Sequence, residues 1–109
     1  MLHSKKVFLS TTTSASVNGN WIQLDPTLNS VGACASYVGV VDPADTVYVD
    51  LTNESLIDTN GDPVVVTAVH TVTAYTSVSS FADSVLGSYN GIRFRKSGSA
   101  GTVRITGMA

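Results

Sequence analysis

The 109-residue sequence has one cysteine, three prolines and little charge, and these shortages exclude several classes of protein. Cys34 has no second cysteine to pair with, so the fold must rest on its core without disulfides within the chain. Charged residues make up only 13% of the sequence, about half the usual share of a soluble domain. A net charge of -2, without a long basic block, argues against a protein whose main task is to bind nucleic acid.

Long apolar runs are also missing. No stretch approaches the ~18 apolar residues of a membrane-spanning helix. Lys5 and Lys6 precede only three apolar residues, Val7 to Leu9, whereas the apolar core of a signal peptide has about 7 to 15. We therefore expect no membrane association and no signal peptide, and the lone cysteine is compatible with assembly in a reducing cytoplasm.

Motifs for catalysis are absent as well. Neither histidine lies in a motif, and the sequence contains no P-loop, nucleophile elbow or metal-binding helix. The eight acidic residues fall almost wholly in predicted turns and loops, so no carboxylate pair is expected to converge in a pocket. Cys34 is flanked by small residues and is predicted to be a small buried side chain rather than a nucleophile. We expect no enzymatic activity, no catalytic residues and no cofactor.

The segment Asp58–Asp62 resembles the opening of an EF-hand calcium loop, with oxygen ligands at the first, third and fifth positions. The match fails further on, because Pro63 stands where the loop needs glycine and Val69 where it needs glutamate. Asn60-Gly61 is a strong turn signal by itself. We therefore predict a polar turn and no metal site.

Short stretches of alternating apolar and polar residues, separated by turn residues, run through most of the sequence. This pattern is typical of β-strands, and we predict about seven of them. No segment supplies the crossover helices of a parallel sheet, so we predict an all-β, antiparallel β-sandwich. Its topology, jelly-roll or immunoglobulin-like, stays open. The 27 serines and threonines suggest either a surface covered by neighbouring molecules or an ordinary secreted β-domain.

The clearest strands are residues 33–41 and 46–52, which we predict to pair as an antiparallel hairpin. Gly39 inside the first of them indicates a bulge or a close approach of the backbone. Residues 64–75 are too long for one regular strand, so a bend is expected there. His70 shares the apolar side of this run and is predicted to be half-buried, since no second metal ligand has a suitable spacing.

One segment has a different pattern. Ser80 and Asp83 have the form of a capping box, Phe81 and Val85 lie four residues apart, and Gly87 suits the end of a helix. We therefore predict at most one short helix in this protein, at residues 80–87.

The end of the chain has the pattern of a β-hairpin, because two alternating runs flank the turn residues Gly98–Ser99. In this register Phe94 faces Val103 and Ile92 faces Ile105. These four side chains are predicted to form the buried side of the hairpin.

The other side of the predicted hairpin is basic, with Arg93 opposite Arg104 and Arg95 opposite Thr102. Like charges directly opposite each other are destabilising unless an acidic group lies nearby. Two interpretations stay open: an aspartate on the adjoining strand, with Asp50 as a candidate, or an acidic surface of a partner.

The chain divides into a predicted N-terminal arm, residues 1–16, and a single β-sandwich domain, residues 17–109. Lys5 to Ser10 alternates like a short edge strand. Thr11 to Ser16 has no large apolar residue, so it is either a mobile arm or a strand held by a partner.

The segment Gly91–Gly107, preceded by Ser80–Val85, resembles the carboxyl ends of many small virion proteins of tailed bacteriophages. In those proteins an Ile-Arg-x-x-Lys-x-Gly strand and turn leads into a short Val-x-Ile/Val-x-Gly strand. Here Ile92 to Gly98 and Val103 to Gly107 follow this pattern. The turn carries Ser97 to Gly101, and an arginine stands at position 95, which is a mild departure. The resemblance covers about a quarter of the chain and implies a non-enzymatic structural subunit of a virion.

Within that class we expect a capsid decoration or cement protein, made in the bacterial host cytoplasm and bound to the capsid surface. The expected partners are the major capsid protein and further copies of the chain in a homotrimer, with neither nucleic acid nor membrane. The expected partner-binding residues are basic: Lys5, Lys6, Arg93, Arg95 and Arg104.

Two alternatives stay open. The first is a component of the phage tail, neck or head fibre. The second is a secreted carbohydrate-binding β-sandwich, in which aromatic residues would form an exposed stacking platform. Its candidate residues are Trp21, Tyr37, Tyr48, Tyr75 and Tyr89.

Overall fold

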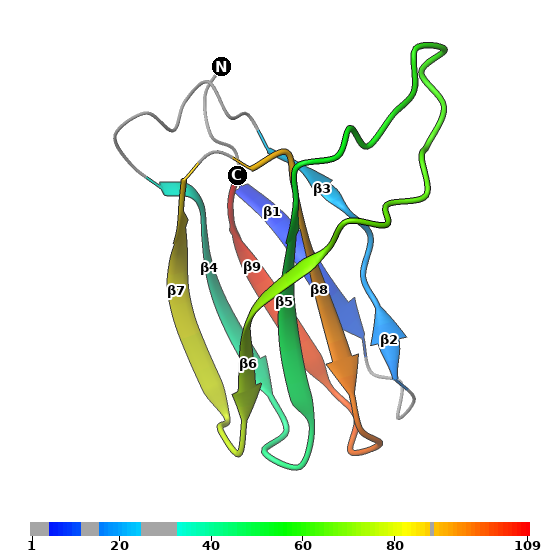
Figure 1. Ribbon diagram of the computed structural model, residues 1–109. Helices are drawn as coiled ribbons and strands as arrows, with labels where there is room; N and C mark the ends of the chain where they lie inside the picture. The colour runs from blue at the N-terminus through cyan, green and yellow to red at the C-terminus, as the bar shows by residue number, and fades with distance from the viewer. Residues whose placement is uncertain (1–4, 12–15, 25–32, 88) are drawn as a thin grey trace.

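Nine β-strands form two antiparallel sheets in the computed structural model, which describes residues 5–11, 16–24, 33–87 and 89–109. The strands are β1 (Lys5–Thr11), β2 (Val17–Asn18), β3 (Ile22–Gln23), β4 (Ala33–Val41), β5 (Thr46–Thr52), β6 (His70–Thr76), β7 (Ser80–Leu86), β8 (Gly91–Ser97) and β9 (Val103–Met108). Sheet I has the order β1-β9-β4-β7, and sheet II has the order β2-β8-β5-β6 with β3 also paired to β8. Figure 1 shows sheet II in front of sheet I. The predicted all-β, antiparallel sandwich is confirmed.

The strand order identifies the topology that the sequence left open. β2 and β3 both pair with β8, so together they form one interrupted edge strand. Eight strands then remain, four in each sheet. Only β5 and β6 are consecutive strands that also pair with each other, and every other connection between these eight described strands crosses to the opposite sheet. This interleaved arrangement is that of a jelly roll and not of an immunoglobulin domain.

The core lies between the sheets and is built by the period-two alternation of the strands. Val47, Val49 and Leu51 of β5 point inward, and Val103 and Ile105 of β9 meet them from the other sheet. The rings of Phe8 and Phe94 stack across the core with centroids 5.1 Å apart. The buried apolar residues are Phe8, Leu9, Leu24, Ala35, Tyr37, Val41, Val47, Val49, Leu51, Phe81, Val85, Ile92, Phe94, Val103 and Ile105.

Both predicted hairpins are wrong, because their strands lie in different sheets. β4 belongs to sheet I and β5 to sheet II, and β8 and β9 are divided in the same way. The turns that join them lie at the lower end of Figure 1 and cross from one sheet to the other. The predicted inward residues are nevertheless buried, since an alternating pattern gives the side that a residue occupies but not the strand it pairs with. Phe94 and Val103 therefore belong to opposite layers of the core.

The turn between β8 and β9 is anchored by a buried ion pair. Asp45 Oδ1 accepts the backbone N–H of Ala100 at 3.0 Å, and Oδ2 accepts that of Gly101 at 3.2 Å. Lys96 Nζ lies 3.3 Å from Asp45 Oδ2 and donates to the Gly101 carbonyl at 2.8 Å. Gly98, at a φ of 112°, leaves no room for a side chain, since a Cβ there would lie 2.2 Å from Asp45 Oδ1.

The helix predicted at residues 80–87 is also wrong, because this segment is strand β7 at the edge of sheet I. Phe81 and Val85 are buried. A spacing of four places two side chains on one side of a strand as well as on one side of a helix, and here the strand pairing with β4 decides. Phe81 lies directly opposite Gly39, where a Cβ would meet the ring at 2.2 Å. The close approach predicted at this glycine is confirmed.

Residues 5–11 of the predicted arm form β1, which pairs with β9 from Lys5↔Met108 to Thr11↔Val103. Phe8 and Leu9 are 4% and 7% exposed, so this part of the arm belongs to the sandwich. The edge strand predicted there is confirmed. Residues 1–4 and 12–15 of the predicted arm lie outside the described residues.

Candidate interaction surfaces

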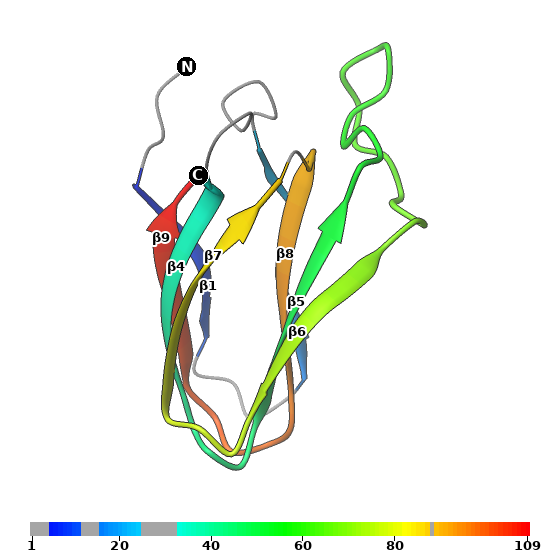
Figure 2. The same cartoon turned by 60° about the vertical axis from the view of Figure 1, so that its left-hand side comes forward.

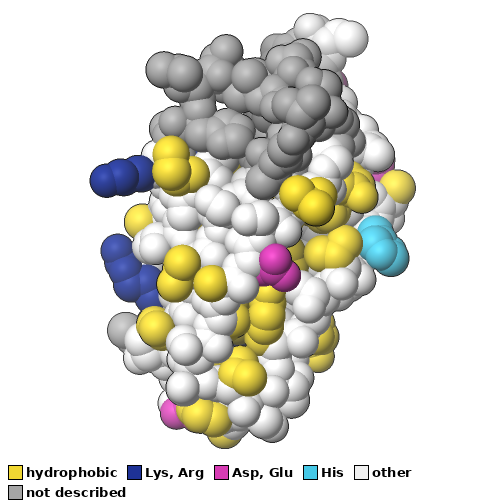
Figure 3. Space-filling model, turned by 90° about the vertical axis from the view of Figure 1, so that its left-hand side faces the viewer, with side chains coloured by type: hydrophobic (Ala, Val, Ile, Leu, Met, Phe, Trp, Pro, Cys, Tyr) yellow, Lys and Arg dark blue, Asp and Glu magenta, His cyan; other side chains and the backbone are white. Residues whose placement is uncertain are grey.

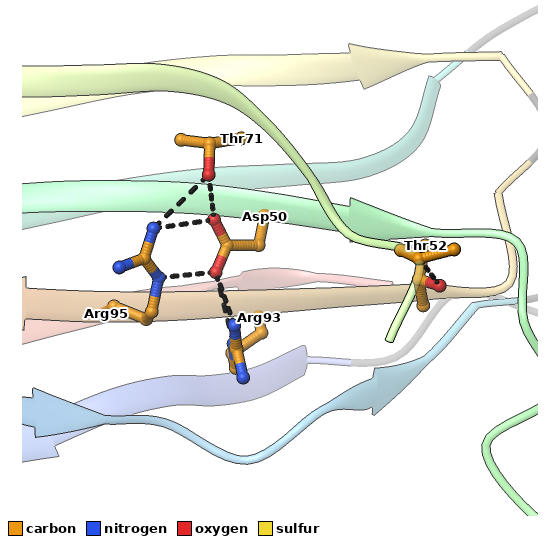
Figure 4. A network of polar contacts seen from close by, with 6 residues as sticks. Asp50, Thr52, Thr71, Arg93 and Arg95 are labelled. Carbon is orange, nitrogen blue, oxygen red and sulfur yellow. Dashed lines mark hydrogen bonds and ion pairs between the residues drawn. The ribbon is translucent and has the colours of Figure 1, made fainter. Parts of the chain in front are cut away.

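The outer face of sheet II carries a cluster of charged side chains around Asp50. β5 lies between β6 and β8, and the register places Arg93 opposite Asp50 on one side and Thr71 on the other. Figure 4 shows the carboxylate of Asp50 between Thr71 and the guanidinium groups of Arg93 and Arg95. Of the two interpretations that stayed open, the structure shows the first, with the candidate Asp50 as the acidic group on the adjoining strand. Arg104 lies on sheet I, so its predicted pairing with Arg93 is wrong.

Every oxygen of the Asp50 carboxylate is hydrogen-bonded. Oδ2 accepts from Arg93 Nε at 3.1 Å, Arg93 Nη2 at 2.9 Å and Arg95 Nε at 2.5 Å. Oδ1 accepts from Arg95 Nη2 at 3.1 Å and Thr71 Oγ1 at 2.6 Å. The Arg95 fork thus binds both oxygens, which is the strong geometry for a guanidinium and a carboxylate.

Two aromatic rings extend this arginine cluster, which we define as Asp50, Thr71, Arg93 and Arg95. The guanidinium carbon of Arg93 lies 4.6 Å from the Trp21 ring centroid, and that of Arg95 lies 4.7 Å from the Tyr48 centroid. These are cation–π contacts. One carboxylate balances two guanidiniums, so the arginine cluster keeps one net positive charge at the surface.

The cluster also determines the protonation state of Asp50. Burial by itself would raise the pKa of Asp50, but the hydrogen bonds from Arg95, Thr71 and Arg93 outweigh it and lower the pKa below the usual value. The same carboxylate raises the pKa of Arg95. Asp50 is therefore ionised at neutral pH and holds both arginines in place.

We expect the thermal stability to fall in acid because of this lowered pKa. A carboxylate with a lower pKa in the folded than in the unfolded protein stabilises the fold above the unfolded value, about 3.9. That contribution is lost as the pH falls through the lower, folded-state pKa. The unfolding midpoint, followed by circular dichroism from pH 7 to pH 2, should be level near neutrality and drop below about pH 4. Asp50→Asn should lower the midpoint at pH 7 and flatten the acid drop, and an unchanged acid drop would contradict the assignment.

The outer face of sheet I carries large exposed apolar side chains among its serines and threonines, although the outer face of an antiparallel sheet is ordinarily polar. The register aligns Val7, Thr106, Val38 and Ala82 in one row across all four strands. We define the apolar face by its five exposed apolar side chains, which are Val7 (52% exposed), Val38 (58%), Val40 (50%), Leu86 (70%) and Met108 (40%). Figure 3 shows hydrophobic side chains on the side of the molecule formed by β7, with an acidic side chain among them and Lys and Arg side chains at one margin.

The charged residues at the described outward positions of sheet I are positive. Lys5 lies opposite Met108, and Arg104 lies between Ser10 and Val40. Arg104 Nη1 donates to Ser10 Oγ at 3.2 Å. The described outward positions of the four strands hold no aspartate or glutamate. Asp83 of β7 alternates with these positions, in phase with the buried Phe81 and Val85, but it is itself exposed at this edge of the sandwich.

The third surface is the connection between β5 and β6, residues 53–69, which we name the tongue. Figures 1 and 2 show it standing clear of both sheets at the end of the molecule opposite the tight turns. Its exposed apolar side chains are Ile57 (55%), Val64 (36%), Val65 (85%) and Val69 (37%). It carries three carboxylates and no lysine, arginine or histidine.

The tongue is held by its own acidic side chains. The Glu54 carboxylate accepts the backbone N–H groups of Thr67, at 2.7 Å, and Ala68, which clamps the base and lowers the pKa of Glu54. At the tip, Asp58 Oδ1 accepts the N–H groups of Asn60 and Asp62 at 2.8 and 3.0 Å. The segment with an EF-hand-like opening is thus a hydrogen-bonded turn.

The predicted partner-binding residues do not gather into one surface. Arg93 and Arg95 belong to the arginine cluster on sheet II, whereas Lys5 and Arg104 lie on the apolar face of sheet I. Lys6 is partly buried on β1 opposite Gly107. The sequence interpretation missed the apolar face and the tongue. A signal for the former was present, because residues 37–41 are apolar or glycine at every position and can therefore present apolar groups on both sides of a strand.

The aromatic residues proposed for carbohydrate stacking do not form one platform either. Tyr37 is buried, and its hydroxyl lies 2.7 Å from that of Tyr75. Tyr75 stacks on Phe81 with centroids 4.2 Å apart, and Tyr89 packs against the core. Trp21 and Tyr48 remain on sheet II, each with an arginine over its ring.

Within the described residues, no three histidine, cysteine, aspartate or glutamate side chains are grouped as metal ligands would be. That part of the chain also contains no helix of the length and apolarity needed to cross a membrane. His70 is exposed, so its predicted half-burial is wrong. The side chain of Cys34 lies outside the described residues.

Comparison with known proteins gives no matching family model, no matching curated protein and no matching solved structure.

Proposed function

We propose that this protein is a non-enzymatic structural subunit of a bacteriophage virion, a decoration protein that binds the outer surface of the capsid and stabilises the head. It acts by contact, through the three surfaces described above. The major capsid protein is its partner, and the assembled virion is its place of action.

The observation that carries the proposal is the apolar face of sheet I. Its five apolar side chains are 40% to 70% exposed. The sequence as a whole has few charged residues and many serines and threonines. Exposed apolar residues concentrated on one face favour a protein interface. In an assembled virion, neighbouring subunits would cover these apolar side chains and remove them from water.

The fold and the end of the sequence support the virion assignment by analogy. Jelly rolls build many viral capsid proteins, although lectins and cupins also use them. The resemblance of residues 91–107 to phage virion proteins favours the first of these uses.

The arginine cluster suits contact with the capsid itself. It presents one net positive charge, two flanking rings and fixed guanidinium groups, so little side-chain entropy is lost when an acidic surface binds there. Because Asp50 already orients both arginines, we expect an acidic surface of the capsid protein opposite β5 and β8.

The number of copies per particle tests the proposed function. Quantitative mass spectrometry of purified virions should find this chain in hundreds of copies. A count of about six to twelve, as in one or two closed rings, would contradict decoration and favour the tail, neck or head fibre. Absence from particles together with binding of the isolated domain on a glycan array would contradict the virion assignment and favour the carbohydrate-binding alternative.

A further inference from the structure

We propose that copies of this chain assemble head to tail, with the tongue of one copy docked on the apolar face of the next. The inference goes beyond the proposed function, because it concerns contacts between copies of the chain and not contacts with the capsid. It rests on where the exposed apolar side chains and the charges lie.

The exposed apolar side chains fall almost entirely on these two surfaces. Ten large apolar residues of the described chain are prominently exposed. Five of them form the apolar face, four lie on the tongue, and only Val72 on β6 lies elsewhere. A contact between unlike sides of two copies requires two such surfaces on one chain, and in the described part of the chain both surfaces are exposed.

The charges of the two surfaces are opposite. The tongue carries Glu54, Asp58 and Asp62 and no basic residue. The apolar face carries Lys5 and Arg104, and no acidic residue among its described outward positions. A second copy therefore offers both the apolar contact and the complementary charge, whereas two apolar faces in contact would bring like charges together.

A single copy cannot make this contact with itself. The tongue rises from β5 and β6 of sheet II, and the apolar face lies on the far side of sheet I (Figures 1 and 2). Contacts between unlike surfaces generate a closed ring when the rotation closes, and otherwise a filament. A ring of three copies would be the homotrimer expected from the sequence, and a reciprocal pair of contacts between two copies would close as a dimer.

The tongue is also ordered before it binds. Glu54 clamps its base, Asp58 fixes its tip, and Val64 N–H donates to the Leu56 carbonyl at 3.0 Å. Less conformational entropy is therefore lost on docking than for an unstructured arm.

The test measures the mass of the 109-residue chain in solution by light scattering and sedimentation, at low and high salt. The wild type should be a closed oligomer that dissociates as salt rises. Asp62→Lys on the tongue and Arg104→Glu on the apolar face should each weaken association at least about tenfold, and the double variant should regain it. Asp42→Lys, a charge reversal on the turn between β4 and β5, is the matched control and should behave as wild type.

Three results would overturn the inference: a monomeric wild type, an oligomer that neither reversal weakens, or a double variant no better than the single ones. Circular dichroism of each variant shows whether it is folded. Should Asp62→Lys or Arg104→Glu fail to fold, Asp62→Asn and Arg104→Gln replace them, with weaker association expected and unchanged association contradicting the proposal. The capsid count is independent, so either proposal can fail without the other.

Discussion

A chain that lacks residues 1–11 is expected not to fold. The deletion removes β1, exposes the edge of β9 and takes Phe8 and Leu9 out of the core, where Phe8 stacks on Phe94. Loss of one buried phenylalanine and one buried leucine costs about 5–10 kcal/mol, which is comparable to the roughly 5–15 kcal/mol that holds a whole domain together. Circular dichroism and thermal melting of the truncated protein check this expectation.

The matched control is deletion of residues 1–4, which leaves β1 complete and should keep a cooperative thermal transition. A folded protein without residues 1–11 that melts near the wild-type temperature would show that the N-terminal segment is an appendage. That result would contradict the place of β1 in sheet I.

Asp45→Ala is expected to produce the largest loss of stability among single substitutions of polar residues. It removes the acceptor of two backbone N–H groups, those of Ala100 and Gly101, and the countercharge of the buried Lys96 ammonium. Hydrogen bonds from Ala100 and Gly101 and the contact with Lys96 also lower the pKa of Asp45, so the carboxylate is charged at neutral pH. Removal of one partner leaves the other buried without a hydrogen bond or countercharge. This destabilises the fold by more than the intact pair contributes to its stability.

Urea denaturation compares this variant with two others. Lys96→Met removes the ammonium group but keeps a side chain of similar length and the two backbone hydrogen bonds from Ala100 and Gly101 to Asp45. The urea midpoint of Lys96→Met should therefore fall less than that of Asp45→Ala. Asp42→Ala changes an exposed aspartate three residues away and should cost little. Equal midpoints for Asp45→Ala and Asp42→Ala would contradict the anchoring role of Asp45.

The alternation of apolar residues predicts the fold class and most of the core because it depends only on the two sides of a strand. Val47, Val49, Phe94 and Ile105 are buried as their patterns indicate. The pairing of strands does not follow from the same information. A tight turn can join two strands of one sheet or two strands of different sheets. Here the turn between β8 and β9 joins the two sheets, and it is held by residues distant in sequence, such as Asp45, which accepts a hydrogen bond from Gly101.

The same limit applies to the interaction surfaces. The partnership of Asp50 with Arg93 was predictable because a lone aspartate stands on an outward position of the best-defined strand. The apolar face was not predictable from the sequence, since Val7, Val38 and Met108 belong to three strands that only the sheet order brings together. The sequence predicted only a polar turn at residues 58–62 and a strand from residue 64 in this region. The valines of the tongue have the alternation of a strand, whereas the strand itself begins at His70.

The most direct test of the central claim, that this jelly roll works through a covered apolar face, is hydroxyl-radical footprinting of purified particles. The oxidation rates of Met108 and Leu86 are compared between the assembled protein and folded chains released at low concentration. We predict strong protection of both residues in the assembly. Equal oxidation in the two states would show that the face is bare in the working protein and would contradict the account.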